Sequence, residues 1–512
     1  MNHSNSDFPM VLLSHRGPVT FQHSESGWTA VRATGGLVNA LTAYLAEYLP
    51  EAIWVCNAMT DADIAVARMY NGSPLRVALT PTPHLVEFGA DATGNERNPR
   101  LNLRMVEVGK AEHRDFYSVV ANPLLWFIQH GLYEFTLEPE FTEREHNAFE
   151  RGYVAVNNLF ADAVAEQLGA FEGRAFAMLH DYHFYLVGEL VRQRYPQIIL
   201  SHFIHIPWPS PDSWRMLPPS WRDRLITGLL GNDVIAFHTK RFARNFLLCA
   251  EEFLDLPTDT DSMTVQFNNR IIKVRHFPIS VDIVNLEKVA NSPTVAQHVR
   301  VLTERFLAQG RQLVLRVDRT DPSKNIVRGF HAFAKLLADH PDLVGRVTFL
   351  AILQPSRQDV PEYRDYLAMI TATVTEINSK YRLPDYQPIQ LYVQNDFALL
   401  MAAYQVFDVL IANSLADGMN LVAKEGALLN ARNGVLALSE TMGVHEELGQ
   451  FAVSLHPLDV QQQADALHKA ITMSPALRRS YSQAAAAAVR RNDIRKWLAD
   501  QLGDLAALAG QG

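Results

Sequence analysis

The 512-residue sequence lacks the features of a secreted, membrane-spanning or metal-stapled protein. It has only 2 cysteines, Cys56 and Cys249, which lie too far apart for a metal knuckle. The first residues, MNHSNSDFPM, have neither the basic nor the apolar region of a signal peptide, and nowhere do about 18 apolar residues run together. We therefore expect a soluble, cytoplasmic protein with buried thiols.

The sequence also lacks an excess of positive charge. Its 46 lysines and arginines stand against 55 aspartates and glutamates, a formal net charge of −9. A broad grip on nucleic acid or on anionic membrane needs a basic surface, so we expect neither partner. A small anionic ligand held by a few cations remains compatible with this charge.

Two nucleotide-binding signatures are missing as well, the GxGxxG fingerprint and the Walker A loop. Their absence disfavours dinucleotide oxidoreductases and P-loop enzymes. A Gly-Gly turn that includes Gly36 opens a predicted helix at 33–45, which is weak evidence alone because glycines are common at helix starts.

Short apolar runs alternate with helical stretches in two series. The first series lies at 10–14, 52–57, 176–182, 198–207 and 233–239, and the second at 312–319, 346–353, 389–395, 408–414 and 434–440. Continuous apolar runs of this length suit strands buried on both faces, so the fold class is α/β with parallel sheets.

A Pro-bearing extended segment, HFPISVD at 276–282, separates the two series. We predict two doubly wound domains, 1–282 and 283–482, with a helix at about 483–512 that packs back on the first. Ligands are expected at the carboxyl ends of the strands, in the cleft between the domains.

The segment after residue 312 is the most informative. A buried strand ends at Arg319, a turn contains Pro322 and Lys324, and an amphipathic helix begins near Asn325. Two cations beside a helix N-terminus predict an anion site that fits a diphosphate. The alternative is a solvated loop with two surface charges.

A second strand end, at 413–429, carries Asp417 and Gly418, with Glu425 about one turn inside the following helix. The glycine permits close backbone approach, and the two carboxylates could hold separate sugar hydroxyls. Ordinary helix capping is the alternative.

Two histidine runs, HDYH at 180–183 and HFIH at 202–205, suggest a four-histidine metal site. On a strand, however, positions three apart point to opposite faces, so His202 and His205 should not converge on one ion. We expect Asp181 and His205 to face the cleft instead, and we expect no metal.

Read together, SHRGP, HDYH, HIPWP, R-x-D-x-x-K, DGMNLVAKE and SETMG resemble, in this order, the motifs of the trehalose-6-phosphate synthases. These are retaining glycosyltransferases of family 20 with the two-domain GT-B fold. The resemblance implies glucose transfer from a nucleoside-diphosphate glucose to glucose 6-phosphate, with no cofactor and no metal, in a homo-oligomer.

The resemblance also implies roles for individual residues. Arg319 and Lys324 would bind and stabilise the leaving diphosphate, His205 would contact the donor glucose, and Asp181 would lie near the acceptor hydroxyl. The implied donor-site residues are Gly36, Asn395, Asp417, Gly418, Met419, Asn420, Leu421 and Glu425. The implied acceptor-site residues are Arg16, Trp54, Tyr117, Trp126, Tyr182 and Arg357, of which the aromatic ones are otherwise core residues by default.

Some positions depart from the family pattern, among them Pro322, Asn325 and the Gly426-Ala427 pair. Asn395 stands where many relatives that use UDP-glucose have an aromatic residue, and this favours GDP-glucose. Three alternatives remain: a pseudo-glycosyltransferase that couples cyclitols, a glucosylglycerol-phosphate synthase, and a catalytically silent sugar-phosphate sensor. Synthase-type Met419 and intact donor-site charges argue against the first and the last.

Overall fold

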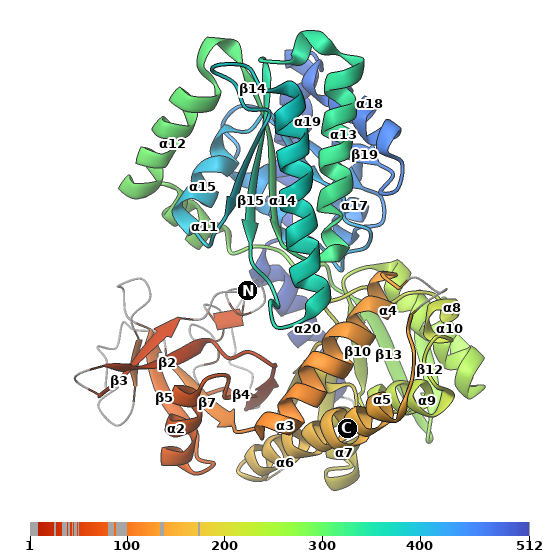
Figure 1. Ribbon diagram of the computed structural model, residues 1–512. Helices are drawn as coiled ribbons and strands as arrows, with labels where there is room; N and C mark the ends of the chain where they lie inside the picture. Colours follow the sequence, from red (N-terminus) through yellow and green to blue (C-terminus); the bar gives the residue numbers. More distant parts are fainter. Residues whose placement is uncertain are drawn as a thin grey trace. The chain divides into compact units, whose positions relative to one another are not determined.

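The chain divides by its internal contacts into two units, Met1–Phe277 with Leu498–Gly512, and Pro278–Trp497 (Figure 1). The computed structural model describes residues 9–24, 27–32, 38, 41–42, 45, 49, 51–79, 86–88, 100–133, 138–172 and 175–510. Gly36 lies outside the described residues. The predicted boundary was at 282, whereas the units change at Pro278, because Phe277 still donates its N–H to Phe237 of the first unit.

The first unit contains a 13-stranded sheet in the order β11-β12-β13-β10-β9-β8-β1-β4-β7-β5-β6-β3-β2. Its central strands pair in parallel: β13 (Arg270–His276), β10 (Val234–Phe237), β9 (Ile199–Phe203), β8 (Phe176–His180), β1 (Met10–Leu13), β4 (Ile53–Asn57) and β7 (Arg100–Val106). Antiparallel strands extend both edges: β11 (Thr258–Asp259), β12 (Thr264–Phe267), β5 (Leu75–Leu79), β6 (Val86–Phe88), β3 (Gly27–Arg32) and β2 (Val19–Ser24).

The first series of apolar runs therefore marks real strands, and the α/β fold class is confirmed. The antiparallel strands, β7 and β13 escaped the sequence analysis because they are not continuous apolar runs: buried residues alternate with half-buried ones along β7, and only Ile272 and Val274 are buried in β13. Helices α2 (Asp61–Tyr70), α6 (Ala155–Gly169), α7 (Val187–Arg194), α9 (Pro219–Leu229) and α10 (Lys240–Leu254) connect these strands.

The second unit is a six-stranded parallel sheet in the order β16-β15-β14-β17-β18-β19. The strands are β14 (Gln312–Arg319), β15 (Val347–Gln354), β16 (Ile389–Val393), β17 (Val409–Ala412), β18 (Val435–Ser439) and β19 (Ala452–Leu455). Counted along the chain this is the order 3-2-1-4-5-6 of a doubly wound sheet, and the order reverses between β14 and β17.

One face of this sheet is covered by α13 (Ile326–Asp339), α14 (Pro361–Tyr381) and α18 (Val460–Ile471). The apolar stripe predicted for α13 is the buried one: Ile326, Phe330 and Phe333 are 0% exposed and Leu337 is 1% exposed. Helix α13 is therefore fixed against the sheet immediately after the turn that carries Lys324.

Two helices follow β19 and α18, where the sequence suggested one. Helix α19 (Pro475–Arg491) groups with the second unit, because Arg478 pairs with Asp408 and Ala485 is buried. Helix α20 (Ile494–Ala509) crosses to the first unit at Leu498, and Asp504 pairs with Arg275 at 3.0 Å. The change therefore comes at 498 and not near 483. Within the described ranges, no helix is long and apolar enough to span a membrane.

Candidate functional site

Strands β14 and β17 pair in parallel in the second unit, with Val314 and Leu315 opposite Val409 and Leu410, so their carboxyl ends lie at the same edge of the sheet. The strand order reverses at this point, and doubly wound sheets bind their ligands at such a reversal. Arg319 ends β14, with Lys324 beyond it, and Asp417 follows β17. The predicted cations and carboxylate are thus brought to one edge.

The turn after β14 is a short 3₁₀ helix, η5 (Pro322–Lys324). Asp321 caps it: its Oδ1 accepts hydrogen bonds from Ser323 N at 3.0 Å and Ser323 Oγ at 2.8 Å. Pro322 fits the first helical position, since its missing N–H is not needed there. This accounts for one of the departures from the family pattern.

Asn325 accounts for another. It adopts a left-handed backbone with φ of 56°, which a glycine would tolerate and which asparagine also tolerates. Its side-chain amide donates to the carbonyls of Asn413 at 2.9 Å and Pro457 at 2.6 Å. The asparagine therefore supplies the turn and also ties the β14 end to the β17 end.

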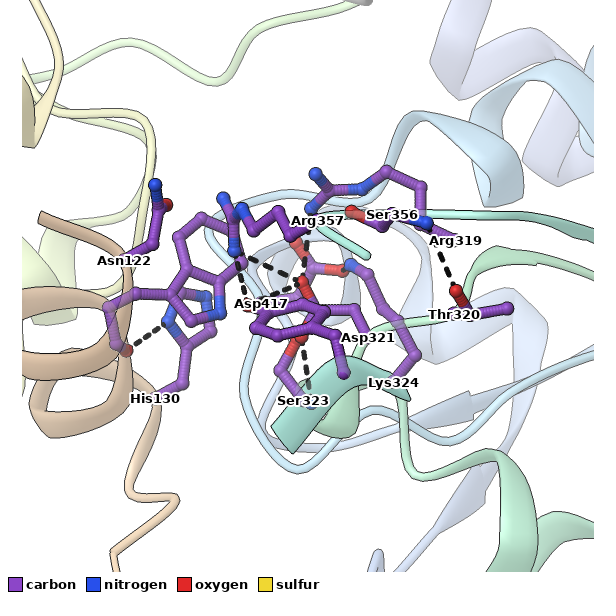
Figure 2. Close-up of polar contacts among 12 residues, drawn as sticks. Asn122, His130, Arg319, Thr320, Asp321, Ser323, Lys324, Ser356, Arg357 and Asp417 are labelled. Atoms are coloured by element: carbon purple, nitrogen blue, oxygen red, sulfur yellow. Dashed lines mark hydrogen bonds and ion pairs between the residues drawn. The ribbon is translucent and has the colours of Figure 1, made fainter. Parts of the chain in front are cut away.

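Lys324 and Asp417 form an ion pair, with Nζ 2.5 Å from Oδ2 (Figure 2). Each side chain is only 13% exposed, so the attraction is weakly screened. Asn420 donates from Nδ2 to the same Asp417 oxygen at 3.1 Å. A cation, a carboxylate and an amide thus converge within hydrogen-bonding distance.

Main-chain hydrogen bonds from the end of the SETMG segment (439–443) and from Val444 hold the loop that carries Asp417. Gly443 N donates to Asp417 O at 3.0 Å, and Val444 N donates to Met419 O at 2.8 Å. A Cβ on Gly443 would lie 2.0 Å from Gly418 O, so only glycine fits there. The loop is held in one conformation by main-chain contacts.

Asn420 begins α16 (Leu421–Leu429), where its Oδ1 accepts from Ala423 N at 3.0 Å. The expected ligand-binding amides of Gly418, Met419, Asn420 and Leu421 therefore lie at a helix N-terminus, whose N–H groups and dipole favour an anion. Glu425 lies one turn further on, and burial raises its carboxyl pKa to about 7.

Arg316 lies beneath the Lys324 turn and is fully buried. It donates from Nε to Asp318 Oδ2 at 2.9 Å, from Nη1 to Asn413 Oδ1 at 2.7 Å and from Nη2 to Lys324 O at 2.5 Å. One guanidinium group therefore connects β14, the start of α13 and the end of β17.

Arg357 follows β15, and its side chain is only 7% exposed. Its Nη1 lies 3.5 Å from Asp321 Oδ2 and is hydrogen-bonded to the hydroxyl of Tyr363. Asn395 follows β16, the edge strand of the sheet, and is exposed there. Arg357 thus contacts Asp321 in the turn after β14, whereas Asn395 follows β16, which lies beyond β15 at the edge of the sheet.

The first unit shows the same reversal of strand order, between β1 and β8. Asp181 directly follows β8 with φ 74° and ψ 172°, a conformation found almost only in glycine that costs about 1–3 kcal/mol. Its Oδ1 accepts a long hydrogen bond from His205 N at 3.4 Å. A strained carboxylate at a sheet reversal is what a functional residue would show.

Burial favours the neutral form of the histidines next to Asp181. His180 Nδ1 lies 3.0 Å from His205 Nε2, and His202 Nε2 lies 3.0 Å from the Asp181 carbonyl oxygen. Burial lowers the pKa of His180 to about 3 and of His202 to about 4, and lowers that of His205 well below its ordinary value. Among the described residues, no group of three or more His, Cys, Asp and Glu could hold a metal ion.

Arg16 is exposed beyond β1, and its carbonyl accepts from Ser14 Oγ at 2.7 Å. Trp54, in β4, is 1% exposed and donates from Nε1 to the same Ser14 Oγ at 2.8 Å. Trp54 therefore supports the turn that carries Arg16, and its contact with an acceptor sugar stays a prediction.

The other aromatic candidates meet around a π-helix, η1 (Arg114–Leu125), a rare element that often marks functional sites. Asn122 connects two of them, donating to the Tyr117 carbonyl at 2.9 Å and accepting from the Tyr182 hydroxyl at 2.8 Å. The Trp126 and Tyr182 rings are 5.6 Å apart. The structure thus gathers three residues that the sequence analysis listed separately.

Several residues at these sites were missed from the sequence. Asp321 stands inside R-x-D-x-x-K and could have been found there, and Arg316 is a charge within an apolar run. His15 stacks on His183 at 4.5 Å and on Tyr117 at 5.0 Å, and Asn122 lies inside η1. His15 stands inside SHRGP and could have been found there, whereas no local pattern marks Asn122, whose partner Tyr182 is 60 residues away.

Comparisons with known proteins identify the family of this chain. A sequence model of glycosyltransferase family 20 matches residues 10–507. The chain belongs to this family. It is thus a glycosyltransferase, and its two units are the Rossmann-like domains of the GT-B fold, as the resemblance implied.

Three similar proteins illustrate the match. An α,α-trehalose-phosphate synthase [UDP-forming] of Emericella nidulans is 30% identical over 92% of this chain and 86% of its own length. A second UDP-forming synthase, from Aspergillus niger, is 34% identical over 91% and 83%. The structure of trehalose-6-phosphate protein from E. coli bound with UDP-2-fluoro glucose has a TM-score of 0.77 at 25% identity and covers 97% of this chain and 98% of that one.

Proposed function

We propose that this glycosyltransferase is an α,α-trehalose-phosphate synthase. It would move glucose from a nucleoside-diphosphate glucose to the anomeric hydroxyl of glucose 6-phosphate with retention, giving α,α-trehalose 6-phosphate and a nucleoside diphosphate. The observation that carries the proposal is the cluster of Arg319, Lys324 and Asp417 at the reversal of the second sheet, with Lys324 2.5 Å from Asp417. The names of the similar family members support it.

The proposed chemistry rests on the leaving group. The bond between glucose C1 and the diphosphate oxygen breaks, and the acceptor oxygen bonds to C1 from the same face. The acceptor proton passes to the departing phosphate, which takes the bonding electron pair. Arg319 and Lys324 would stabilise the charge that develops on this phosphate, and Lys324, whose side chain is only 13% exposed, would do so with little screening by solvent.

The remaining groups would orient the two sugars. Asp417 can accept from glucose hydroxyls, and neutral His205 can share a hydrogen bond without adding charge. Arg357 and Arg16 would take the acceptor phosphate, because guanidinium groups match phosphate geometry. Tyr117, Trp126 and Tyr182 would line the acceptor sugar, and Asp181 would lie near its anomeric hydroxyl.

The donor base is the finer part of the proposal. Asn395 favours GDP-glucose in the sequence analysis, but the similar synthases are named UDP-forming and give that preference no support. We therefore propose UDP-glucose as the donor. We propose that the reaction needs no metal ion, because Arg319 and Lys324 take its place beside the diphosphate. We also propose that the protein is a homo-oligomer, which light scattering would test.

The test offers UDP-, GDP- and ADP-glucose in parallel with glucose 6-phosphate, after chelation of divalent metals. Product mass and the NMR couplings of both anomeric protons identify an α,α-1,1 linkage. The highest kcat/KM is expected with UDP-glucose. Absence of trehalose 6-phosphate with all three donors would refute the synthase, and a preference for GDP-glucose would refute only the base.

A variant pair tests the assigned groups. Arg319→Ala and Asp417→Ala should each abolish transfer and leave the far-UV circular dichroism unchanged. Arg346→Ala is a matched control, since Arg346 precedes β15 at the opposite edge of the same sheet. Retained transfer in either site variant contradicts the assigned roles.

A further inference from the structure

One buried carboxylate lies between the two arginines to which the proposed function gives different phosphates. Asp321 Oδ2 is 3.5 Å from Arg319 Nη2 and 3.5 Å from Arg357 Nη1 (Figure 2). Asp321 is 0% exposed, whereas the Arg319 side chain is 40% exposed and can reach a ligand. The same oxygen atom thus orients the proposed diphosphate arginine and the proposed acceptor-phosphate arginine.

The carboxylate itself is fixed on its other side. Oδ1 accepts the two hydrogen bonds from Ser323, and the Asp321 carbonyl accepts from Lys324 N at 3.0 Å. The Tyr363 hydroxyl lies 3.5 Å from Oδ2 and also contacts Arg357. Because these contacts leave Asp321 little freedom, any arginine that pairs with it is placed relative to the Lys324 turn.

The loop that carries Arg357 is hydrogen-bonded to Thr320, which directly follows β14. Ser356 N donates to Thr320 Oγ1 at 3.1 Å, and Thr320 N donates to Gln354 O at 2.8 Å. Arg357 has a φ of 47°, and its carbonyl accepts from Val360 N at 2.9 Å, which turns the side chain back towards Asp321. Main chain and side chain therefore agree on one position for Arg357.

We propose that Asp321 is a positioning residue that couples the two phosphate-binding arginines. Two guanidinium groups so close together repel each other, and a single carboxylate between them offsets that repulsion and sets the direction of both. The assignment rests on the proposed function, which gives Arg319 the leaving diphosphate and Arg357 the acceptor phosphate. Loss of the carboxylate should therefore weaken the binding of both substrates, although Asp321 contacts neither of them.

Asp321→Asn is the decisive variant. We expect KM for UDP-glucose and KM for glucose 6-phosphate each to rise about tenfold, and kcat to fall about tenfold because Arg319 no longer meets the departing phosphate. Tyr363→Phe removes the hydroxyl that contacts Arg357 and lies 3.5 Å from Asp321 Oδ2, but it keeps the carboxylate that pairs with Arg319. It should raise KM for glucose 6-phosphate and leave KM for UDP-glucose unchanged.

Asp408 supplies a matched control in the same unit. It is also buried, at 3% exposed, and it also pairs with two arginines, Arg432 at 3.3 Å and Arg478 at 2.9 Å. It precedes β17 and so lies at the opposite edge of the sheet. Asp408→Asn should lower the unfolding temperature and leave both KM values unchanged.

Thermal shift with inorganic pyrophosphate and with glucose 6-phosphate, added separately, tests the coupling without turnover. Both should raise the unfolding temperature of the wild type and of Asp408→Asn, and both shifts should shrink in Asp321→Asn. A change in only one shift, or equal losses in Asp408→Asn, would overturn the coupling. If the wild type shows both shifts but makes no trehalose 6-phosphate, the proposed function fails and the coupling stands.

Discussion

Arg316→Met is the perturbation from which the structure predicts the largest local effect. The side chain is fully buried, and its removal leaves Asp318, Asn413 Oδ1 and Lys324 O without the donor that each uses. Methionine fills part of the volume but donates nothing. Burial already raises the pKa of the Asp318 carboxyl to about 6, so without Arg316 this group, 3% exposed, would either carry an unpaired buried charge or bind a proton, and both cost free energy.

Breaking a buried ion pair by removing one partner costs about 3–5 kcal/mol. Each neutral acceptor left without a donor adds about 1–3 kcal/mol, although the three losses overlap because one side chain serves all of them. We therefore expect about 4 kcal/mol, which is roughly a thousand-fold in the opening equilibrium of the second unit.

Hydrogen exchange followed by mass spectrometry on peptides of β14 and β17 measures that opening. Tryptophan fluorescence would report mainly on the first unit, because Trp497 is the one tryptophan of the second unit and the others lie at or before position 221. Arg432→Met is the matched control: its side chain is 40% exposed and 3.3 Å from Asp408, so its loss should cost less than about 1 kcal/mol.

The double variant Arg316→Met/Asp318→Val separates charge from packing. Replacing both members of a buried pair by apolar residues is often neutral, so exchange should return towards the wild-type rate. Transfer activity should stay low, because the Lys324 carbonyl still lacks its donor. If Arg316→Met exchanges no faster than Arg432→Met, or if the double variant opens more than the single one, the reasoning is refuted.

Three further predictions concern Glu425, the buried histidines and Gly329. Burial raises the Glu425 pKa to about 7, so the neutral carboxyl stabilises the folded state fully below the ordinary carboxyl pKa, and this stabilisation is lost as pH rises through 7. The unfolding temperature of the wild type, measured relative to that of Glu425→Gln, should therefore fall between pH 5 and pH 8. The imidazoles of His180 and His202 should show no change in NMR chemical shift between pH 6 and pH 8, and a titration in that range would contradict their neutral burial. Gly329→Ala should speed hydrogen exchange of β14 and lower kcat, because its Cβ would lie 2.4 Å from Arg316 Nη1. Exchange and turnover equal to the wild type would show that the Arg316 side chain moves aside without loss.

Much of the fold could be read from local pattern. Each of the ten apolar runs contains a strand, and the apolar stripe of α13 is its buried face. Both could be predicted because strands and helices of a doubly wound fold show their buried positions as short periodic patterns in the sequence. The edge strands could not be read in this way, and neither could the two-helix end, where α19 and α20 join different units. Those features depend on which neighbour covers each element.

The site divides in the same way. The sequence by itself determined where Arg319, Lys324 and Asp417 stand, since each follows a strand and precedes a helix, and motif order identified the family. Only the tertiary structure decided that Lys324 meets Asp417 across 93 residues, that Asp321 serves both Arg319 and Arg357, and that Asp181 is strained. The reason is physical: these contacts follow from the order of strands in the sheets, and no local periodicity carries that order.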